Sequence, residues 1–205
     1  MKKRRLKVWP IIILVVFVIL LFCLKDIYDS LNSKKQTELK VVDIIEKYDY
    51  TLKEKESSYY ISLFKKLKKE LNKEKINEEN YATLISQMFL ADFFNLENKI
   101  NKNDVGGVEF IYKDYQDDFI KGAKDTVYNY VENNIYGDRK QELPNVKEVI
   151  VKDIQNKEYN SEKINDDKAY YMELEIKYNK DLDYQDKVKL ILVHSNDKLE
   201  IVSMK

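Results

Sequence analysis

The sequence predicts an α+β fold: an N-terminal transmembrane helix, then one domain with about three helices packed on a curved antiparallel sheet of three to four strands. Three observations lead to this prediction. The chain begins with an apolar run, its middle repeats apolar residues every three or four positions, and its last third alternates apolar and polar residues. Helices first and strands last is the order typical of an α+β domain.

The first element is an unbroken apolar run over residues 8–24. As a helix, its 17 residues would measure roughly 26 Å, slightly less than a bilayer core of about 30 Å, so Lys7 and Lys25 would reach toward the headgroups. Five cations precede the run, whereas two acids follow soon after Lys25. Because cytoplasmic flanks are rich in Lys and Arg, residues 1–7 are predicted to be a cytoplasmic tail. The rest of the chain is then expected outside the cell membrane.

Two other interpretations of this segment are less consistent with its residues. A cleaved signal peptide would need small residues after the apolar run, but the chain there reads Phe22-Cys23-Leu24-Lys25. A lipoprotein would need a small residue before its cysteine, where Phe22 stands. The sequence therefore favours an uncleaved anchor. Since Cys23 is the only cysteine, the fold must be held by its core rather than by an intramolecular disulfide.

The polar residues 25–40 are predicted to form a stalk, and residues 41–205 a single extracytoplasmic α+β domain. The whole chain has 36 basic and 36 acidic residues, but its first 25 residues carry six cations and no acid. The remainder thus holds 30 basic and 36 acidic residues, a net charge of minus six. A domain of this sign lacks the basic surface that nucleic acids require, so no nucleic acid partner is expected.

Helical periodicity is clear in three segments of the middle of the chain. The first, residues 56–72, places on one side the apolar residues Tyr60, Leu63, Phe64, Leu67 and Leu71. The second begins after a predicted cap, Asn77, and its apolar residues are Tyr81, Leu84, Ile85, Met88, Phe89 and Phe93. The third is expected to end at Gly137, and its apolar side carries Tyr115, Phe119, Ala123, Val127, Tyr130 and Val131.

After Pro144 the period changes from about 3.6 to 2, which indicates strands with one wet face. The clearest strand places on one face Tyr170, Met172, Leu174, Ile176 and Tyr178. Residues 188–194 repeat the pattern, and Asn196-Asp197 is expected to turn the chain into residues 199–204. Residues 146–154 supply a further strand, so the predicted sheet is an antiparallel meander.

The adjacent glycines Gly106 and Gly107 are predicted to form a structural turn together with Asp104. A phosphate-binding loop needs spaced glycines, or a Lys-Ser or Lys-Thr pair after them, so that several amides converge on one anion. This pair provides neither. A turn or bulge that needs a positive φ, or a close approach of the backbone, explains it better.

The chemistry-bearing residues do not form a recognisable reaction centre. His194 is the only histidine, which excludes a histidine-based metal cluster and favours a hydrogen-bonded structural role. Neighbouring acids such as Asp166-Asp167 usually mark exposed surface. Asp92 lies within an apolar stretch, where a buried partner could tie its helix to the glycine turn; a role as catalytic acid is the alternative. No cofactor and no metal are expected.

Sixteen tyrosines are more than a core of this size would hide. Most are expected to be half-buried at the rim of the sheet. A sharper hypothesis is that some line the concave face of the sheet or its mouth and form a docking surface for a protein or a glycan. The candidates for this surface are Tyr128, Tyr130, Tyr170, Tyr171, Tyr178 and His194.

The order of these elements resembles the cystatin-like cone of the nuclear transport factor 2 superfamily. The resemblance spans residues 45–205 and is carried by three helices, the extended piece 105–108 before the third, and the closing strands. Anchored domains of this kind are similar in outline to assembly factors of bacterial type IV secretion and conjugation systems. Residues 81–108 also resemble a stretch that recurs in anchored proteins of Gram-positive bacteria.

Anchor and domain together predict a single-span, non-catalytic interaction or assembly module of the bacterial cell envelope. The resemblance implies a place in a secretion or conjugation machine, with protein partners and homo-oligomerisation. The first alternative is a receptor domain for a cell-wall glycan or peptide. The second is a hydrolase that uses Asp92 or a neighbouring carboxylate.

Overall fold

A computed structural model of the chain describes residues 20, 21, 23, 24 and 40–205. The chain divides into two units, residues 1–39 and 40–205. The predicted tail 1–7, and nearly all of the predicted span 8–24 and stalk 25–40, lie outside the described residues. Within the described part of the chain, no helix is both long enough and apolar enough to cross a bilayer.

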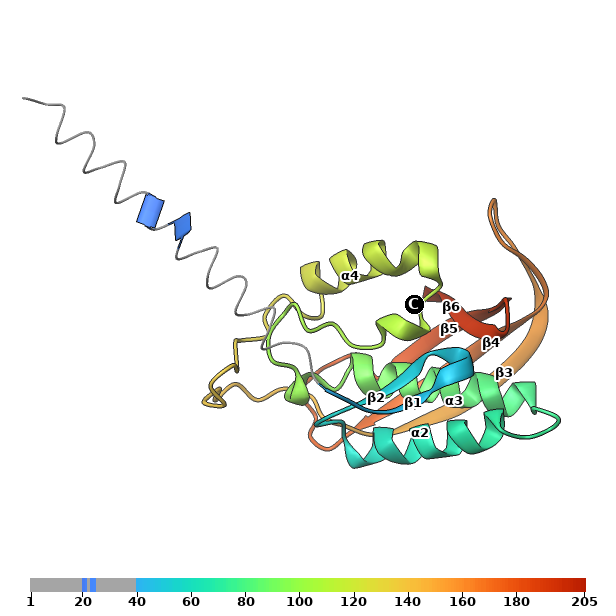
Figure 1. Cartoon of the computed structure of the whole chain (residues 1–205), viewed down its shortest axis with the longest axis horizontal. Coiled ribbons are helices and arrows are strands. Elements are labelled where there is room, and N and C mark those ends of the chain that lie inside the picture. The colour runs from blue at the N-terminus through green and yellow to red at the C-terminus, as the bar shows by residue number, and fades with distance from the viewer. Residues whose placement is uncertain (1–19, 22, 25–39) are drawn as a thin grey trace, which may run out of the picture. The chain divides into compact units, whose positions relative to one another are not determined.

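The second unit has an α+β architecture, as predicted (Figure 1). It begins with a hairpin of β1 (Val41–Ile45) and β2 (Tyr50–Lys53), which the sequence reading missed. Three helices follow: α2 (Ser58–Leu71), α3 (Glu78–Phe93) and α4 (Gln116–Asp125). The chain closes with β3 (Val146–Asn160), β4 (Asn165–Tyr178), β5 (Lys187–Ser195) and β6 (Lys198–Met204).

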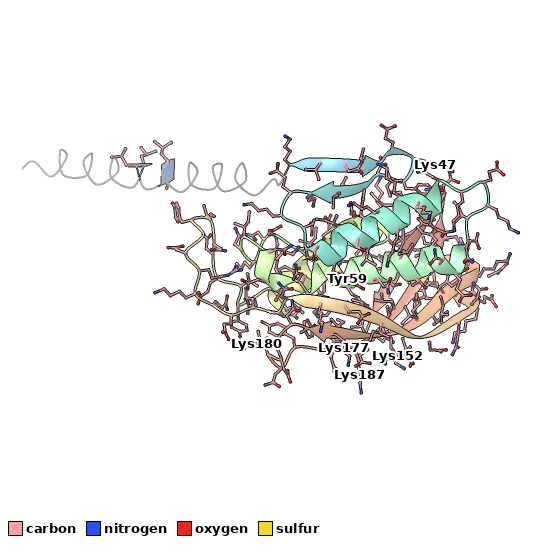
Figure 2. All side chains as sticks on the ribbon, turned by 90° about the horizontal axis from the view of Figure 1, so that it is seen from below. Lys47, Tyr59, Lys152, Lys177, Lys180 and Lys187 are labelled. Carbon is pink, nitrogen blue, oxygen red and sulfur yellow. The ribbon has the colours of Figure 1, made fainter. Side chains whose placement is uncertain are left out.

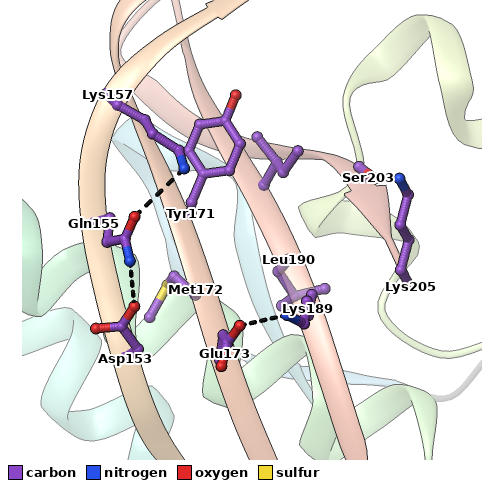
Figure 3. A pocket seen from close by; sticks show the side chains of 11 residues that line it. Asp153, Gln155, Lys157, Tyr171, Met172, Glu173, Lys189, Leu190, Ser203 and Lys205 are labelled. Atoms are coloured by element: carbon purple, nitrogen blue, oxygen red, sulfur yellow. Dashed lines mark hydrogen bonds and ion pairs between the residues drawn. The ribbon is translucent and has the colours of Figure 1, made fainter.

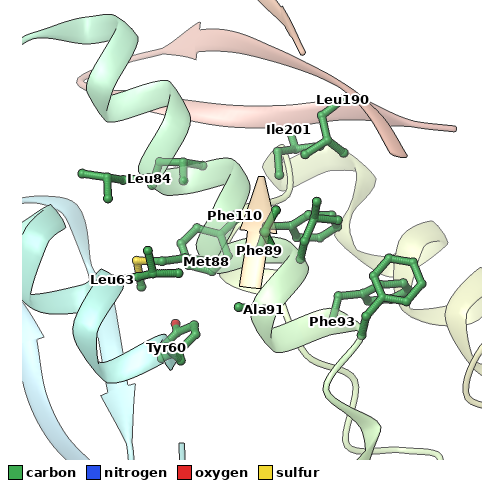
Figure 4. Close-up of a cluster of buried hydrophobic side chains, with 14 of the residues drawn as sticks. Tyr60, Leu63, Leu84, Met88, Phe89, Ala91, Phe93, Phe110, Leu190 and Ile201 are labelled. Atoms are coloured by element: carbon green, nitrogen blue, oxygen red, sulfur yellow. The ribbon is translucent and has the colours of Figure 1, made fainter. Parts of the chain in front are cut away.

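Side-chain caps define where the two long helices begin. The Ser57 hydroxyl accepts a hydrogen bond from the Tyr60 amide at 3.1 Å, and the Asn77 side chain accepts one from the Asn80 amide at 2.9 Å. The cap predicted at Asn77 is therefore confirmed. Every apolar residue predicted for the inner sides of α2 and α3 is buried. Many of them meet in the cluster drawn in Figure 4, between the helices and the sheet.

The four closing strands form one antiparallel sheet in the order β3-β4-β5-β6, which confirms the predicted meander. Its inner face packs on α3 through Met172, Leu174, Val188, Leu190 and Ile201, all buried. Three register shifts interrupt the β3–β4 ladder, and this hairpin curves away from the rest of the sheet (Figure 1). The strand predicted over 146–154 is longer in the structure and continues to Asn160. Its second half has mostly exposed polar residues and a bulge, so no alternation of apolar and polar residues marked it in the sequence.

The third helix is shorter than predicted. At Thr126 the backbone leaves the helical region, with φ −123° and ψ −99°, so α4 ends at Asp125 rather than near Gly137. The turn that follows directs Tyr128 into the core, where its hydroxyl donates to the Phe93 carbonyl at 2.6 Å. Burial of this aromatic ring and its hydroxyl therefore takes the place of the rest of the expected helix. Tyr130, predicted to lie on the apolar side, is 80% exposed.

The layers place one sheet face in contact with helices and leave most of the other open; at one end of this second face, Ala169 and Val193 are buried in a small cluster with Tyr112 and Tyr115. In Figure 2 the β1–β2 hairpin lies on one side of α2 and α3, and the four-stranded sheet lies on the other side. The hairpin is held there by the Tyr50 ring, whose hydroxyl contacts that of Tyr81 on α3 at 2.7 Å. The sheet face that points away from α2 and α3 is the one on which polar and charged residues lie.

Candidate functional site

The uncovered face of the four-stranded sheet is hollowed into a groove of about 300 Å³ (Figure 3). We call this hollow the sheet groove. Its lining comes from all four strands: Asp153, Gln155, Lys157, Tyr171, Glu173, Lys189, Ile191, Ser203 and Lys205, together with Met172 and Leu190, whose side chains belong to the buried inner face. A second hollow of about 440 Å³ adjoins it and shares Glu173, Lys189 and Lys205. The open face is thus a continuous surface that crosses the sheet.

Strand register arranges the charges of the sheet groove in a row. Asp153 on β3 pairs with Glu173 on β4, Glu173 pairs with Lys189 on β5, and Lys189 pairs through backbone hydrogen bonds with Lys205 beyond β6. The next row repeats the order, with Glu175 on β4 opposite Lys187 on β5. Within these rows the acids lie on β3 and β4 and the lysines on β5 and beyond β6, while Lys152 and Lys157 add positive charge on β3.

Ion pairs hold these side chains in place. Glu173 pairs with Lys189 across the strands, and Glu175 pairs with Lys177 and, at 2.6 Å, with Lys152. Figure 2 shows Lys152, Lys177 and Lys187 together on the side of the sheet away from α2. Since the lysines of these pairs are solvent-exposed, each pair adds little stability, and the ammonium groups stay available to a partner.

Tyr171 is the aromatic residue of the sheet groove. The Lys157 ammonium lies 4.2 Å from the centre of its ring, and the same ammonium reaches the Gln155 amide oxygen at 3.4 Å. Gln155 in turn donates to the Asp153 carboxylate at 2.6 Å. The groove thus combines an aromatic anchor with donors and acceptors of both charges, which suits a peptide or protein segment.

The structure does not bring the predicted tyrosine surface together. Tyr171 lies in the sheet groove, but Tyr170 and Tyr178 belong to the opposite, inner face of β4. The Tyr178 hydroxyl donates to the Gln185 carbonyl at 2.7 Å. Tyr130 is exposed in the loop after α4, and Tyr128 is fully buried, so Tyr128 cannot take part in a docking surface. Neighbouring positions on a strand point to opposite faces, and this separates Tyr170 from Tyr171.

His194 lines a separate cleft of about 270 Å³ at the end of β5. The Asp166 carboxylate accepts hydrogen bonds from the His194 backbone N–H at 2.7 Å and from the His194 Nδ1 at 2.9 Å. The His194 Nε2 lies 3.8 Å from a carboxylate oxygen of Glu78. The Tyr170 ring is next to the His194 ring, with centres 6.1 Å apart. Among the described residues that line this cleft there is no serine, threonine or cysteine.

Asp166 ties the beginning of β4 to the end of β5. Burial raises the pKa of its carboxyl, but hydrogen bonds from the His194 and Lys168 amides and from the His194 ring outweigh burial and lower it. The ionised acid thus orients the imidazole, which agrees with the hydrogen-bonded role predicted for His194. The sequence singled out both residues but gave no sign that they meet.

The glycine turn is anchored by buried side chains. Asp92, at the end of α3, pairs with the Lys99 ammonium through one oxygen and accepts the Gly107 N–H at 2.6 Å through the other. The Tyr128 hydroxyl accepts the Gly106 N–H at 3.0 Å. Gly107 has φ 75°, the left-handed region that the predicted turn requires. A short 3-10 helix (Val108–Phe110) follows the turn.

Asp92 is therefore a structural acid in this arrangement. Burial raises the pKa of its carboxyl, but the Lys99 ammonium and the Gly107 amide lower it below its usual range. Asp104, the third predicted turn residue, accepts the Ile100 amide at 3.0 Å. Since both oxygens of Asp92 are engaged by buried partners, this carboxyl is not free to transfer a proton to a substrate.

Two acids near the turn carried no signal in the sequence. Glu109 accepts the backbone N–H of Thr51 at 3.1 Å and its hydroxyl at 2.9 Å through one oxygen. Its other oxygen accepts the Tyr60 hydroxyl at 3.2 Å. Glu56 lies in a run of alternating Lys and Glu that reads as exposed loop, yet burial, and then the charge of Asp92, raise its pKa to about 7. Only the folded chain places it near Asp92.

The variant Glu56→Gln is expected to remove a pH dependence of stability. The pKa of Glu56 is about 7 in the native domain against 4.5 in the unfolded chain. Between pH 4.5 and pH 7, Glu56 is therefore protonated in the native domain and ionised in the unfolded chain. Stability from the protonated form is full below pH 4.5 and is lost as the pH rises through 7. At pH 8 the variant should be more stable by on the order of 2 kcal/mol, as measured by urea unfolding. Equal pH slopes for both proteins would contradict this.

No protein-family model, curated protein or solved structure matches this chain. Across the residues that the structure describes, no group of three or more His, Cys, Asp or Glu is arranged to hold a metal ion. The architecture defines the chain as an α+β protein with three helices, a two-stranded hairpin and a four-stranded antiparallel sheet in residues 40–205.

Proposed function

We propose that this protein is a membrane-anchored, extracytoplasmic interaction or assembly module of the bacterial cell envelope. Residues 8–24 are its single span, with residues 1–7 in the cytoplasm. The cationic tail, the apolar run and the acid-containing segment after it support this orientation. Helices on one face of a bent antiparallel sheet support a cone of the nuclear transport factor 2 type, and with it a place in a secretion or conjugation machine.

The observation that carries the proposed function is the sheet groove. It is open, it crosses all four strands, and its row from Asp153 to Lys205 has acids at one end and lysines at the other. A partner segment with basic residues over β3–β4 and acidic residues over β5–β6 would complement this row of charges. Tyr171 supplies the aromatic anchor that such interfaces favour. The groups bind and orient a partner and are not arranged for bond cleavage.

A second candidate is a receptor for a cell-wall glycan or peptide. The Tyr171 ring beside the Gln155 amide and the Asp153 carboxylate offers stacking and hydrogen bonds of the kind that a sugar uses. The Lys157 ammonium, however, already occupies a position over that ring. A sugar would have to displace it, whereas an acidic peptide side chain would pair with it. The geometry therefore favours a protein partner.

The paired variant Glu173→Lys with Lys189→Glu tests this proposal. It keeps the cross-strand ion pair but reverses the charge order that a partner meets. Full-length protein would be crosslinked in intact cells and purified from detergent-solubilised membranes. We expect the envelope proteins captured by the wild type to fall at least tenfold in yield with the variant, and Lys65→Glu on the exposed side of α2 to leave them unchanged.

Three outcomes would separate the possibilities. Recovery of the protein alone under all crosslinking conditions would overturn the interaction module. Retention of purified wall fragments by the full-length protein, lost with Tyr171→Ala, would replace it with the receptor. Resistance of residues 41–205 to protease added outside spheroplasts, with cleavage after lysis, would overturn the proposed orientation.

A further inference from the structure

The strand β1 exposes an apolar edge. Val41, Val42 and Ile44 are 46%, 55% and 39% exposed, although they are large β-branched residues. In the part of the chain that the structure describes, β1 pairs with β2 alone, so its other edge faces outward. The edge strand β3 is protected by charges and by three register shifts, whereas β1 has one shift, between Val41 and Asp43, and three exposed apolar residues. An apolar edge with so little protection is a template for strand addition.

The sequence of this edge is complementary to itself. Residues 40–46 read Lys-Val-Val-Asp-Ile-Ile-Glu. If two copies of β1 run antiparallel about Asp43, Val42 of each copy lies opposite Ile44 of the other. Val41 of each then lies opposite Ile45 of the other, so the residues paired on either side of Asp43 are all apolar. Lys40 and Glu46 lie just outside the strand, Glu46 in a 3-10 helix (Glu46–Tyr48). A shift by one residue would place Asp43 opposite an apolar residue, which fixes this register.

The central residue is prepared for such a pairing. Two Asp43 side chains would be neighbours, but each is neutralised by its own Lys68, whose ammonium lies 2.7 Å from the carboxylate. The Ile44 N–H is bonded to the Asp43 carboxylate at 2.8 Å rather than to β2. In a paired edge this amide can exchange that side-chain acceptor for a carbonyl of the partner strand, while Asp43 keeps Lys68.

We propose that two copies of this chain associate through antiparallel pairing of β1 with β1. The two hairpins then form one sheet in the order β2-β1-β1-β2 about a two-fold axis. The first residues of the two strands would be roughly 14 Å apart along the strand direction, at about 3.4 Å for each of four residues, so two anchors can enter the same membrane. The paired strands are short, and the association gains from the high effective concentration of copies in one bilayer. The proposal does not depend on the sheet groove or on its partner.

Cysteine crosslinking of the full-length protein in its own membrane tests this pairing. All variants carry Cys23→Ser so that the native thiol cannot react. Cells that co-express a Val42→Cys copy and an Ile44→Cys copy, with distinct tags, should form mixed disulfides on mild oxidation. The matched control is Lys65→Cys on α2, which is exposed but distant from β1 in sequence. We expect at least a tenfold higher crosslinked fraction for the 42 and 44 pair.

A second variant separates pairing from chance collision. Adding Lys68→Ala leaves Asp43 charges without a counter-ion at the two-fold axis, so the mixed crosslink should fall severalfold. Adding the groove variant Glu173→Lys with Lys189→Glu should leave it unchanged. Equal crosslinking at 42, 44 and 65 would overturn the proposal. The proposal would also be overturned if lipid-soluble oxygen reached a nitroxide spin label attached at Val42→Cys, because that result would assign the strand to the bilayer surface.

Discussion

Replacing Asp92 with asparagine is expected to lower the free energy of unfolding by about 3–5 kcal/mol. Asparagine can still accept the Gly107 N–H, but it leaves the buried Lys99 ammonium without its counter-ion. Burial lowers the pKa of Lys99, but the Asp92 carboxylate raises it above its usual range, so the lysine is charged in the native domain. Urea unfolding of the full-length protein in detergent, followed by circular dichroism, measures the loss.

The double variant Asp92→Leu with Lys99→Met is the matched control. It removes both charges and replaces them with apolar side chains of similar length, but it leaves the Gly107 N–H without its acceptor, so only part of the lost stability should return. A loss below about 1 kcal/mol for Asp92→Asn would show that the pair contributes little. A folded Asp92→Asn protein that loses a hydrolytic activity of the wild type would instead restore this acid as a catalytic candidate.

Replacing Gly106 with alanine is expected to destabilise the domain by at least about 3 kcal/mol. A Cβ at this position would lie 2.5 Å from the Asp92 carbonyl oxygen, 2.6 Å from its carboxylate and 2.7 Å from the Lys99 ammonium. The backbone oxygen cannot rotate away, so the turn must move and the buried ion pair with it. Thermal unfolding of the full-length variant provides the measurement.

The other glycines separate the contributions of space and backbone conformation. Gly137 has φ 74° and open space around it, so alanine there should cost only about 1–2 kcal/mol for the left-handed conformation. Gly122 lies within α4, also with open space, and alanine there should stabilise the helix by up to about 1 kcal/mol. If Gly106→Ala were no worse than Gly137→Ala, the close approach would not be the reason for this glycine.

Local patterns were enough where one element buries one face. The three- and four-residue spacing in α2 and α3, the cap at Asn77 and the alternation in β4 and β5 follow from the geometry of a single helix or strand. Patterns failed where an element is short or polar. The hairpin strands β1 and β2 have five and four residues, which is too few for a period to stand out, and Asp43 interrupts the first.

Long-range contacts decided the candidate sites. The sheet groove requires Asp153, Glu173 and Lys189 to lie side by side, and this depends on the register of three strands. The inward turn of Tyr128 likewise depends on an acceptor, the Phe93 carbonyl, that is 35 residues away. No local rule encodes either arrangement, so the tyrosines that the sequence grouped together were divided between two faces, a loop and the core.

The sequence by itself determined the class of fold, its two long helices, its meander of strands and the turn at the glycine pair. Each of these follows from spacing within a few neighbouring residues. The tertiary structure alone decided which charges meet, because Asp92 with Lys99, Asp166 with His194 and Glu173 with Lys189 are joined by packing. Burial then sets which of these groups hold the fold and which remain exposed to a partner.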